Sequence, residues 1–253
     1  MRKNIVAGNW KMNKNVIEAQ QLMFQLLDYK KNNATNCEVW IAPPSLYLMM
    51  AKDIYEQDEI GVFAQDMSEH ESGAFTGEIS ADMLESIDAT GAIIGHSERR
   101  QYHGETDSHC NRKVKLALDK GLTPIYCNGE TLEQRKAGQH LDVVKNQTEV
   151  ALFTLSAEEI KKVVNAYEPV WAIGTGETAS PEQAQEIHAH IRSLIAAKYG
   201  QDVADEISIL YGGSVKPDNA KEIFSQPDID GGLIGGAALK AEDFAKIIEG
   251  FNS

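Results

Sequence analysis

The segment Thr-Gly-Ala-Ile-Ile-Gly-His-Ser-Glu-Arg-Arg, residues 90–100, holds the pattern that decides the fold. Its apolar run, Ala92-Ile93-Ile94, has the length and the β-branched content of a short buried strand. Ser97, followed by charged residues, is typical of the start of a helix. A strand is therefore predicted to lead within a few residues into a helix, and the same succession recurs along the chain.

Eight short apolar runs are predicted to be strands. They are Ile5–Gly8, Val39–Ala42, Gly61–Gln65, Thr90–Gly95, Thr123–Cys127, Lys162–Glu168, Ser208–Tyr211 and Gly231–Gly235. The predicted helices between them are Val16–Lys31, Ser80–Ser86, Asp107–Lys120, Leu141–Leu152, Pro181–Lys198, Asp218–Phe224 and Ala241–Gly250, with a weaker candidate after Pro44. Continuous rather than alternating hydrophobicity indicates parallel strands that are covered on both faces.

The spacing of these units favours one closed architecture. Each strand and its connection take about 32 residues, which matches a βα unit. No Pro- or Ser-rich linker interrupts the sequence. Eight units in 253 residues favour an α/β fold of the closed (β/α)₈ type, a TIM barrel, over an open doubly wound sheet. We expect residues 1–253 to form a single domain.

Composition excludes several classes of partner. The formal net charge of −14 argues against binding to nucleic acid or to an anionic membrane. No window approaches the roughly 20 apolar residues needed to span a bilayer, and the N-terminus does not resemble a signal peptide. The three cysteines lie far apart without a Cys-x-x-Cys spacing, which argues against a disulfide framework and a zinc site. A cytoplasmic location is expected.

Polar side chains follow several of the predicted strands. Asn9 and Lys11 follow the first, Gln65 the third, His96 the fourth and Glu168 the sixth. In a (β/α)₈ barrel the carboxyl ends of all strands meet on one face, where the active sites of barrel enzymes lie. These side chains are therefore expected to converge.

Glu168 combines an acidic side chain with apolar surroundings. It ends an apolar strand, and Pro169 holds it in an extended conformation. The Gly-punctuated run after Pro169 can cover the carboxylate, and loss of water would make it a better base. The alternative interpretation is an ordinary helix-start or surface carboxylate.

His96 and Lys11 each have a functional and a plain interpretation. A helix beginning after His96 would favour its neutral form, which could donate a hydrogen bond to a carbonyl oxygen. Lys11 could attract an anionic ligand to this acidic protein, with Glu98 as its counter-ion. Alternatively, the imidazole is structural and the lysine is solvated.

Two glycine-rich turns follow the last two strands. Gly212-Gly213-Ser214 follows the seventh, and Gly235-Gly236 follows the eighth. Glycine is common in any tight turn. Two such turns at these positions, with a short helix after the eighth strand, are more typical of a phosphate site built from backbone N–H groups. A third glycine-rich loop, residues 73–78, exposes Phe75 and indicates a partner surface.

Taken together, these motifs resemble the triosephosphate isomerase family. The matching stretches, in order, are Asn9-Trp10-Lys11-Met12-Asn13, Gly95-His96-Ser97-Glu98-Arg99-Arg100, Ala166 to Gly176 and Tyr211-Gly212-Gly213-Ser214-Val215. The resemblance runs from about residue 4 to residue 250. It implies an aldose–ketose isomerase of glycolysis and gluconeogenesis that interconverts dihydroxyacetone phosphate and D-glyceraldehyde 3-phosphate through an enediolate, without a metal or organic cofactor.

The resemblance also implies a role for each site residue. Glu168 would be the proton acceptor, His96 the electrophile that polarises the carbonyl, and Lys11 the electrostatic stabiliser. Substrate binding would involve Asn9, Lys11, Gly174, Ser214, Gly235 and Gly236. Residues 169–179 would form a lid, and the loop around Thr76 would contact a second subunit in a homodimer.

Three residues depart from the family pattern. Glu177 stands where lysine is usual, Asn128 replaces an aliphatic residue, and Ala238 stands where serine is common. None is expected to touch the reacting atoms.

Two other functions share parts of the pattern. A different phosphate-binding barrel, such as a lyase or a tryptophan-pathway synthase, would not need His96, Lys11 and Glu168 together. A non-catalytic binding protein would typically lack the base or the lysine.

Overall fold

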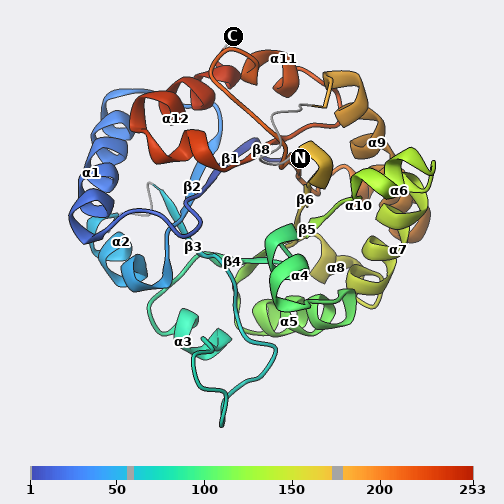
Figure 1. Ribbon diagram of the computed structural model, residues 1–253, viewed down its shortest axis with the longest axis horizontal. Coiled ribbons are helices and arrows are strands. Elements are labelled where there is room, and N and C mark those ends of the chain that lie inside the picture. Colours follow the sequence, from blue (N-terminus) through green and yellow to red (C-terminus); the bar gives the residue numbers. More distant parts are fainter. Residues whose placement is uncertain (1, 56–59, 173–178, 253) are drawn as a thin grey trace.

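Eight parallel strands form a closed ring at the centre of the molecule (Figure 1). The computed structural model describes residues 2–55, 60–172 and 179–252. The strands follow one another around the barrel in chain order: β1 Ile5–Asn9, β2 Glu38–Ala42, β3 Gly61–Ala64, β4 Gly91–Ile94, β5 Thr123–Asn128, β6 Val164–Tyr167, β7 Ile209–Tyr211 and β8 Gly231–Ile234. The predicted (β/α)₈ barrel is confirmed.

Helices surround the ring of strands (Figure 1). They are α1 Val16–Asn32, α2 Leu48–Ile54, α3 Ala81–Glu85, α4 Ser97–His103, α5 Asp107–Asp119, α6 Leu132–Lys136, α7 His140–Leu152, α8 Ala157–Ile160, α9 Pro181–Tyr199, α10 Gln201–Ala204, α11 Ala220–Phe224 and α12 Ala241–Ile248, with 3₁₀ turns η1 Ser45–Tyr47, η2 Val170–Ala172, η3 Gly236–Leu239 and η4 Glu249–Phe251. The weaker helix after Pro44 is confirmed as η1 and α2. The short helices α6, α8 and α10 were not predicted.

Side chains near the helix starts fix where the helices begin. The Asn15 side chain accepts hydrogen bonds from the N–H groups of Ile17 and Glu18 at the start of α1. Ser180 does the same for Gln183 at the start of α9, where Pro181 occupies the first turn. Each cap satisfies N–H groups that lack partners inside the helix. The connections that lead into these helices therefore end at defined residues.

Apolar side chains fill both sides of the sheet. Inside the barrel, a small buried cluster includes Ile5, Trp40, Phe63, Ile125 and Leu210. A much larger cluster lies between the outer faces of the strands and the helices. Because both faces are buried, the strands need apolar residues at successive positions, which explains their continuous hydrophobicity.

The segment between β3 and α3 projects away from the barrel (Figure 1). Phe75 in this segment stacks on His70, with ring centroids 3.7 Å apart. Phe75 and Thr76 are exposed. The expected glycine-rich loop of residues 73–78 with an exposed aromatic side chain is therefore present.

The barrel closes where β1 meets β8. Ile5 is in register with Gly231, and the Ile5 N–H donates to Asp230 O at 2.9 Å. A Cβ atom added to Gly231 would lie 1.8 Å from Ile5 O, and its φ of +136° also disfavours other residues. The two strands can approach this closely only because residue 231 has no side chain.

Gly231→Ala should therefore lower the free energy of unfolding by about 2–3 kcal/mol, because the strands must separate to admit the methyl group. Urea unfolding monitored by circular dichroism measures the loss. Gly138→Ala is the matched control: its φ is +71°, but a Cβ there would meet nothing within 4 Å. Its cost should stay near 1 kcal/mol. Equal losses in the two variants would contradict the close approach.

Candidate active site

A cavity of about 600 Å³ opens at the carboxyl ends of the strands. Its lining includes Asn9, Lys11, His96 and Glu168, which come from the ends of β1, β4 and β6. The turns after β7 and β8 complete the wall with Gly212, Gly213, Ser214, Gly235 and Gly236. The structure thus brings together the predicted site residues that lie within its described part. Gly174 lies outside the described residues.

Glu168 is buried, and its carboxylate is fully engaged. One oxygen, Oε2, accepts from the Ser97 N–H at 2.8 Å. The other, Oε1, lies 3.3 Å from the Ser97 hydroxyl and 3.0 Å from His96 Nε2. The side chain is 2 % exposed, as expected for a carboxylate kept from water. A ligand that uses this carboxylate must replace some of these contacts.

His96 caps helix α4 with its own ring. Its Nδ1 accepts a hydrogen bond from the Glu98 N–H at 3.2 Å, so Nδ1 carries a lone pair rather than a proton. The remaining ring nitrogen, Nε2, then bears the hydrogen and faces Glu168 at 3.0 Å. The Glu98 carboxylate lies 3.7 Å from Nδ1, which is too far for a hydrogen bond. The geometry therefore selects a neutral imidazole that donates from Nε2 into the site.

Lys11 has a backbone conformation that is unusual for a residue with a side chain. Its φ is +50°. Two contacts hold it there: its N–H donates to Asn9 Oδ1 at 3.0 Å, and its carbonyl accepts from Gln65 Nε2 at 2.9 Å. The ammonium forms an ion pair with Glu98 Oε1 at 2.6 Å, so the predicted counter-ion is confirmed. Strain of this kind is retained where surrounding contacts fix it, often at functional sites.

Glu98 connects His96 and Lys11. Its backbone N–H holds His96, and its carboxylate holds Lys11. Its side chain is 42 % exposed, so the ion pair adds little to stability. Its effect is to orient the imidazole and the ammonium relative to each other.

The glycine turns offer unobstructed backbone. A Cβ added to Gly236 would meet nothing within 4 Å. Within the described part of the chain, the N–H groups of Gly213, Ser214 and Gly236 have no acceptor. The 3₁₀ turn η3 begins at Gly236, which confirms the short helical element expected after the eighth strand. These free donors suit an oxyanion.

The first residues after Glu168 are anchored to a buried carboxylate. Glu130 Oε1 accepts from Trp171 Nε1 at 2.8 Å and from the Tyr167 hydroxyl at 3.1 Å. Arg135 also donates to Glu130 at 3.0 Å. The start of the expected lid is thus fixed to the barrel. The rest of the expected lid before Ala179, including Gly176 and Glu177, lies outside the described residues.

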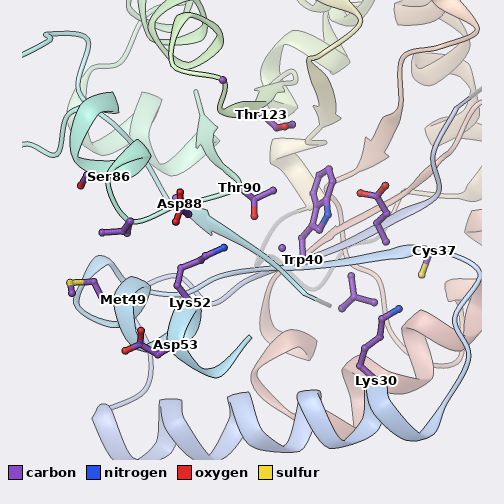
Figure 2. A pocket seen from close by; sticks show the side chains of 16 residues that line it. Lys30, Cys37, Trp40, Met49, Lys52, Asp53, Ser86, Asp88, Thr90 and Thr123 are labelled. Atoms are coloured by element: carbon purple, nitrogen blue, oxygen red, sulfur yellow. The ribbon is translucent and has the colours of Figure 1, made fainter. Parts of the chain in front are cut away.

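A larger cavity of about 1190 Å³ lies at the opposite end of the barrel (Figure 2). Part of its lining comes from residues that begin strands or precede them, including Glu38, Thr90 and Thr123, and part comes from α1 and α2. Figure 2 shows Trp40 and Lys52 among the side chains around it. Size alone therefore does not identify the site, because the predicted base, imidazole and lysine are at the other end. Among the described residues, no group of three His, Cys, Asp or Glu side chains could hold a metal ion.

Comparison with known proteins gives the family. The family model for triosephosphate isomerase matches residues 4–251. The chain belongs to the triosephosphate isomerase family. It is 57 % identical over 252 residues to the triosephosphate isomerase of Bacteroides fragilis, covering 100 % of both chains. It is also 55 % identical to the enzymes of that name from Porphyromonas gingivalis, with 99 % of this chain and 100 % of the relative covered, and Flavobacterium johnsoniae, with 98 % and 99 % covered.

Several supporting residues were not assigned a role from sequence. Ser97 binds Glu168, although the sequence indicated only that it begins a helix. Gln65 was placed at a strand end, but its contact with Lys11 was not foreseen. Glu105 Oε2 accepts a hydrogen bond from the Gly95 N–H at 3.0 Å, and Arg100 Nε donates to the Gly95 carbonyl at 2.7 Å. These contacts fix the residue before His96.

Two departures from the family pattern can be placed. Asn128 is buried and hydrogen-bonded to Thr148 at 3.0 Å. Ala238 is buried beside Gly8, where an added Cβ would lie 2.9 Å from its own. The hydrogen bonds that the Asn128 side chain donates go to Thr148 and Asn165.

The geometry predicts the tautomer of His96. At pH 7, ¹⁵N NMR of imidazole-labelled protein should give His96 an unprotonated Nδ1 and a protonated Nε2, because Nδ1 accepts from the Glu98 N–H. His103, which is exposed on the same helix, provides the internal comparison. A protonated Nδ1 on His96 at pH 7 would contradict the assignment.

Proposed function

We propose that Glu168, His96 and Lys11 carry out the family's reaction in this chain. Members of the triosephosphate isomerase family interconvert dihydroxyacetone phosphate and D-glyceraldehyde 3-phosphate, and this chain is an isomerase of triose phosphates. The observation that best supports the assignment is the 3.0 Å contact between Glu168 Oε1 and His96 Nε2 inside the cavity. A base and a hydrogen-bond donor at this separation can act on adjacent atoms of one small substrate.

In the proposed mechanism, Glu168 removes a proton from the carbon beside the substrate carbonyl. The electron pair of the broken C–H bond forms the C=C bond of an enediolate, and negative charge develops on the carbonyl oxygen. His96 donates a hydrogen bond from Nε2 to that oxygen and transfers protons between the two oxygens. Glu168 then returns its proton to the neighbouring carbon, which completes the isomerisation without net redox change.

Lys11 and Asn9 stabilise the charge that develops on the oxygen. The ammonium is already oriented by Glu98, and the Asn9 side chain is oriented by the Lys11 N–H. At an effective dielectric near 20, an ammonium about 4 Å from an anionic oxygen contributes roughly 4 kcal/mol. Groups that are fixed before the reaction need no rearrangement as the charge forms.

The phosphate group is proposed to bind at Ser214, Gly235 and Gly236, with Gly174 from the lid. The free N–H groups after β7 and β8 support this assignment. Backbone donors allow an acidic protein of net charge −14 to bind an anion without many basic side chains. Closure of residues 169–179 would then exclude water from Glu168 and protect the enediolate.

No metal or organic cofactor is proposed, because proton transfer between adjacent carbons requires neither. A different phosphate-binding barrel, such as a lyase or a synthase of tryptophan biosynthesis, would share the glycine turns. A binding protein on the same scaffold would share the cavity. A coupled assay with D-glyceraldehyde 3-phosphate separates these possibilities from the isomerase.

Glu168→Gln should lower kcat about 10²–10⁴-fold, because the amide cannot accept the proton. The coupled assay measures the loss, and the Gln side chain should leave the fold intact. Glu222→Gln, on the exposed face of α11, is the matched control and should keep full activity. Near-normal turnover of the Glu168 variant would remove this residue from its role.

We further propose a cytoplasmic, single-domain protein that forms a homodimer through the Thr76 loop. Met12 and Leu46 are 96 % and 86 % exposed, which is unusual for large apolar side chains. A cavity of about 270 Å³ beside Met12 is also lined by Lys11 and Gln65. A partner loop in that cavity would support the site.

The three cysteines are free and buried, which suits a reducing compartment. No helix in the described ranges has the length and apolarity to cross a membrane.

Leu46→Asp should convert the homodimer into monomers, because a charge would replace an apolar contact in the interface. Sedimentation velocity at micromolar concentration measures the change. The isolated fold should lose less than about 0.5 kcal/mol, since the side chain is exposed. Val150→Asp, on α7 across the barrel in Figure 1, should remain dimeric. A wild-type protein that sediments as a monomer would contradict the dimer.

A further inference from the structure

Two buried amides face each other on neighbouring strands beside the site. Asn128 ends β5, and Asn165 lies on β6; they are 2 % and 0 % exposed. Each side chain donates from Nδ2 to the Oδ1 of the other at 3.3 Å. A buried amide that lacks hydrogen-bond partners destabilises the folded chain. The pair therefore ties the end of β5 to the strand that leads to Glu168.

The amide pair continues into helix α7. Asn128 Nδ2 also donates to Thr148 Oγ1 at 3.0 Å, and that hydroxyl donates to the Val144 carbonyl at 2.7 Å. Thr148 is completely buried. These two hydrogen bonds run from the strand to the helix, and each donor has a defined acceptor.

Gln147, the neighbour of Thr148, forms hydrogen bonds with both the N–H and the carbonyl of Gly129. Its Oε1 accepts from the Gly129 N–H at 2.8 Å, and its Nε2 donates to the Gly129 carbonyl at 3.1 Å. The Gln147 carbonyl accepts from the Tyr126 hydroxyl at 2.8 Å. The end of β5 is therefore held to α7 at three successive points: Tyr126, Asn128 and Gly129.

The other side of the same backbone supports Glu168. The Glu168 N–H donates to the Asn128 carbonyl at 2.7 Å. A Cβ added to Gly129 would lie only 1.7 Å from the Glu168 carbonyl oxygen, so the two backbones are in direct contact. The Val170 N–H donates to the Glu130 carbonyl at 3.2 Å. Residues 128–130 thus lie between helix α7 and the backbone of the proposed base.

We propose that Gln147, with the chain Asn165–Asn128–Thr148, is a positioning device for Glu168. It fixes the Asn128–Gly129 backbone from the helix side, and that backbone fixes the starting point of the Glu168 side chain. Gln147 and Thr148 come from the helix layer, whereas Glu168 lines the cavity. The inference rests on the proposed function of Glu168 as the base. A reacting group displaced by about 1 Å can cost about 10²-fold in rate, so a smaller shift should still be measurable.

Gln147→Met tests the proposal, because it keeps the length of the side chain but removes both hydrogen bonds to Gly129. We expect kcat for D-glyceraldehyde 3-phosphate to fall about tenfold, with KM within about twofold of wild type, since the phosphate turns lie on β7 and β8. The deuterium isotope effect on kcat with substrate labelled at C2 should rise, because proton removal becomes a larger part of the barrier. Thr148→Val is the milder second variant and should lower kcat about threefold.

Asn111→Leu is the matched control. Asn111 donates to the Ala151 carbonyl at 2.7 Å and to Thr154 Oγ1 at 2.8 Å, so it also holds α7 but makes these contacts away from β5. It should lower the melting temperature without changing kcat or the isotope effect. Equal losses of kcat in Gln147→Met and Asn111→Leu would overturn the proposal in favour of general loosening of the helix.

Glu168→Gln, assayed in parallel, separates the two hypotheses. If that variant turns over normally, the proposed function of Glu168 fails. If it is inactive while folded Gln147→Met and Thr148→Val both keep wild-type kcat and isotope effect, the positioning proposal alone fails.

Discussion

The hydrogen bonds between β1 and β8 close the sheet, and the position of every candidate site residue depends on that closure. Because all eight strands run parallel, closure brings their carboxyl ends to one rim. Lys11, His96 and Glu168 are far apart in sequence but meet there in one cavity. Close backbone approach at Gly231 is therefore a condition for the site as well as for the fold.

Much of this architecture could be predicted from sequence, because both faces of the sheet are buried. Continuous apolar runs marked all eight strands to within about two residues at each end. The helices α6, α8 and α10 were not predicted, and their four or five residues are too few to display a helical period. The equally short α3 and α11 were found only as parts of the longer predicted segments Ser80–Ser86 and Asp218–Phe224. Propensity in such short segments is outweighed by the tertiary contacts that hold them.

The residues that line the candidate site could be predicted to lie together, but their contacts could not. Chain position placed Glu168 and His96 at one rim, and Glu98, which is 87 positions from Lys11, was the expected counter-ion of that lysine. Sequence cannot show that Ser97 binds the Glu168 carboxylate, since this depends on the rotamers of residues 71 positions apart. In the sequence, the only sign of the hydrogen-bonded side chains around Asn128 was an amide residue in an apolar run. Its partners on β6 and α7 are set by packing.

The conformation of Lys11 has a consequence for the proposed binding of a small anion. Its positive φ is enforced by Asn9 and Gln65, and its ammonium is tethered to Glu98. The conformational entropy of this long side chain is thus lost during folding rather than at encounter with a ligand. A triose phosphate offers few atoms with which to offset such ordering. Because the Lys11 side chain is already ordered in the folded chain, binding need not order it. The few contacts of the ligand can then contribute to discrimination between similar compounds.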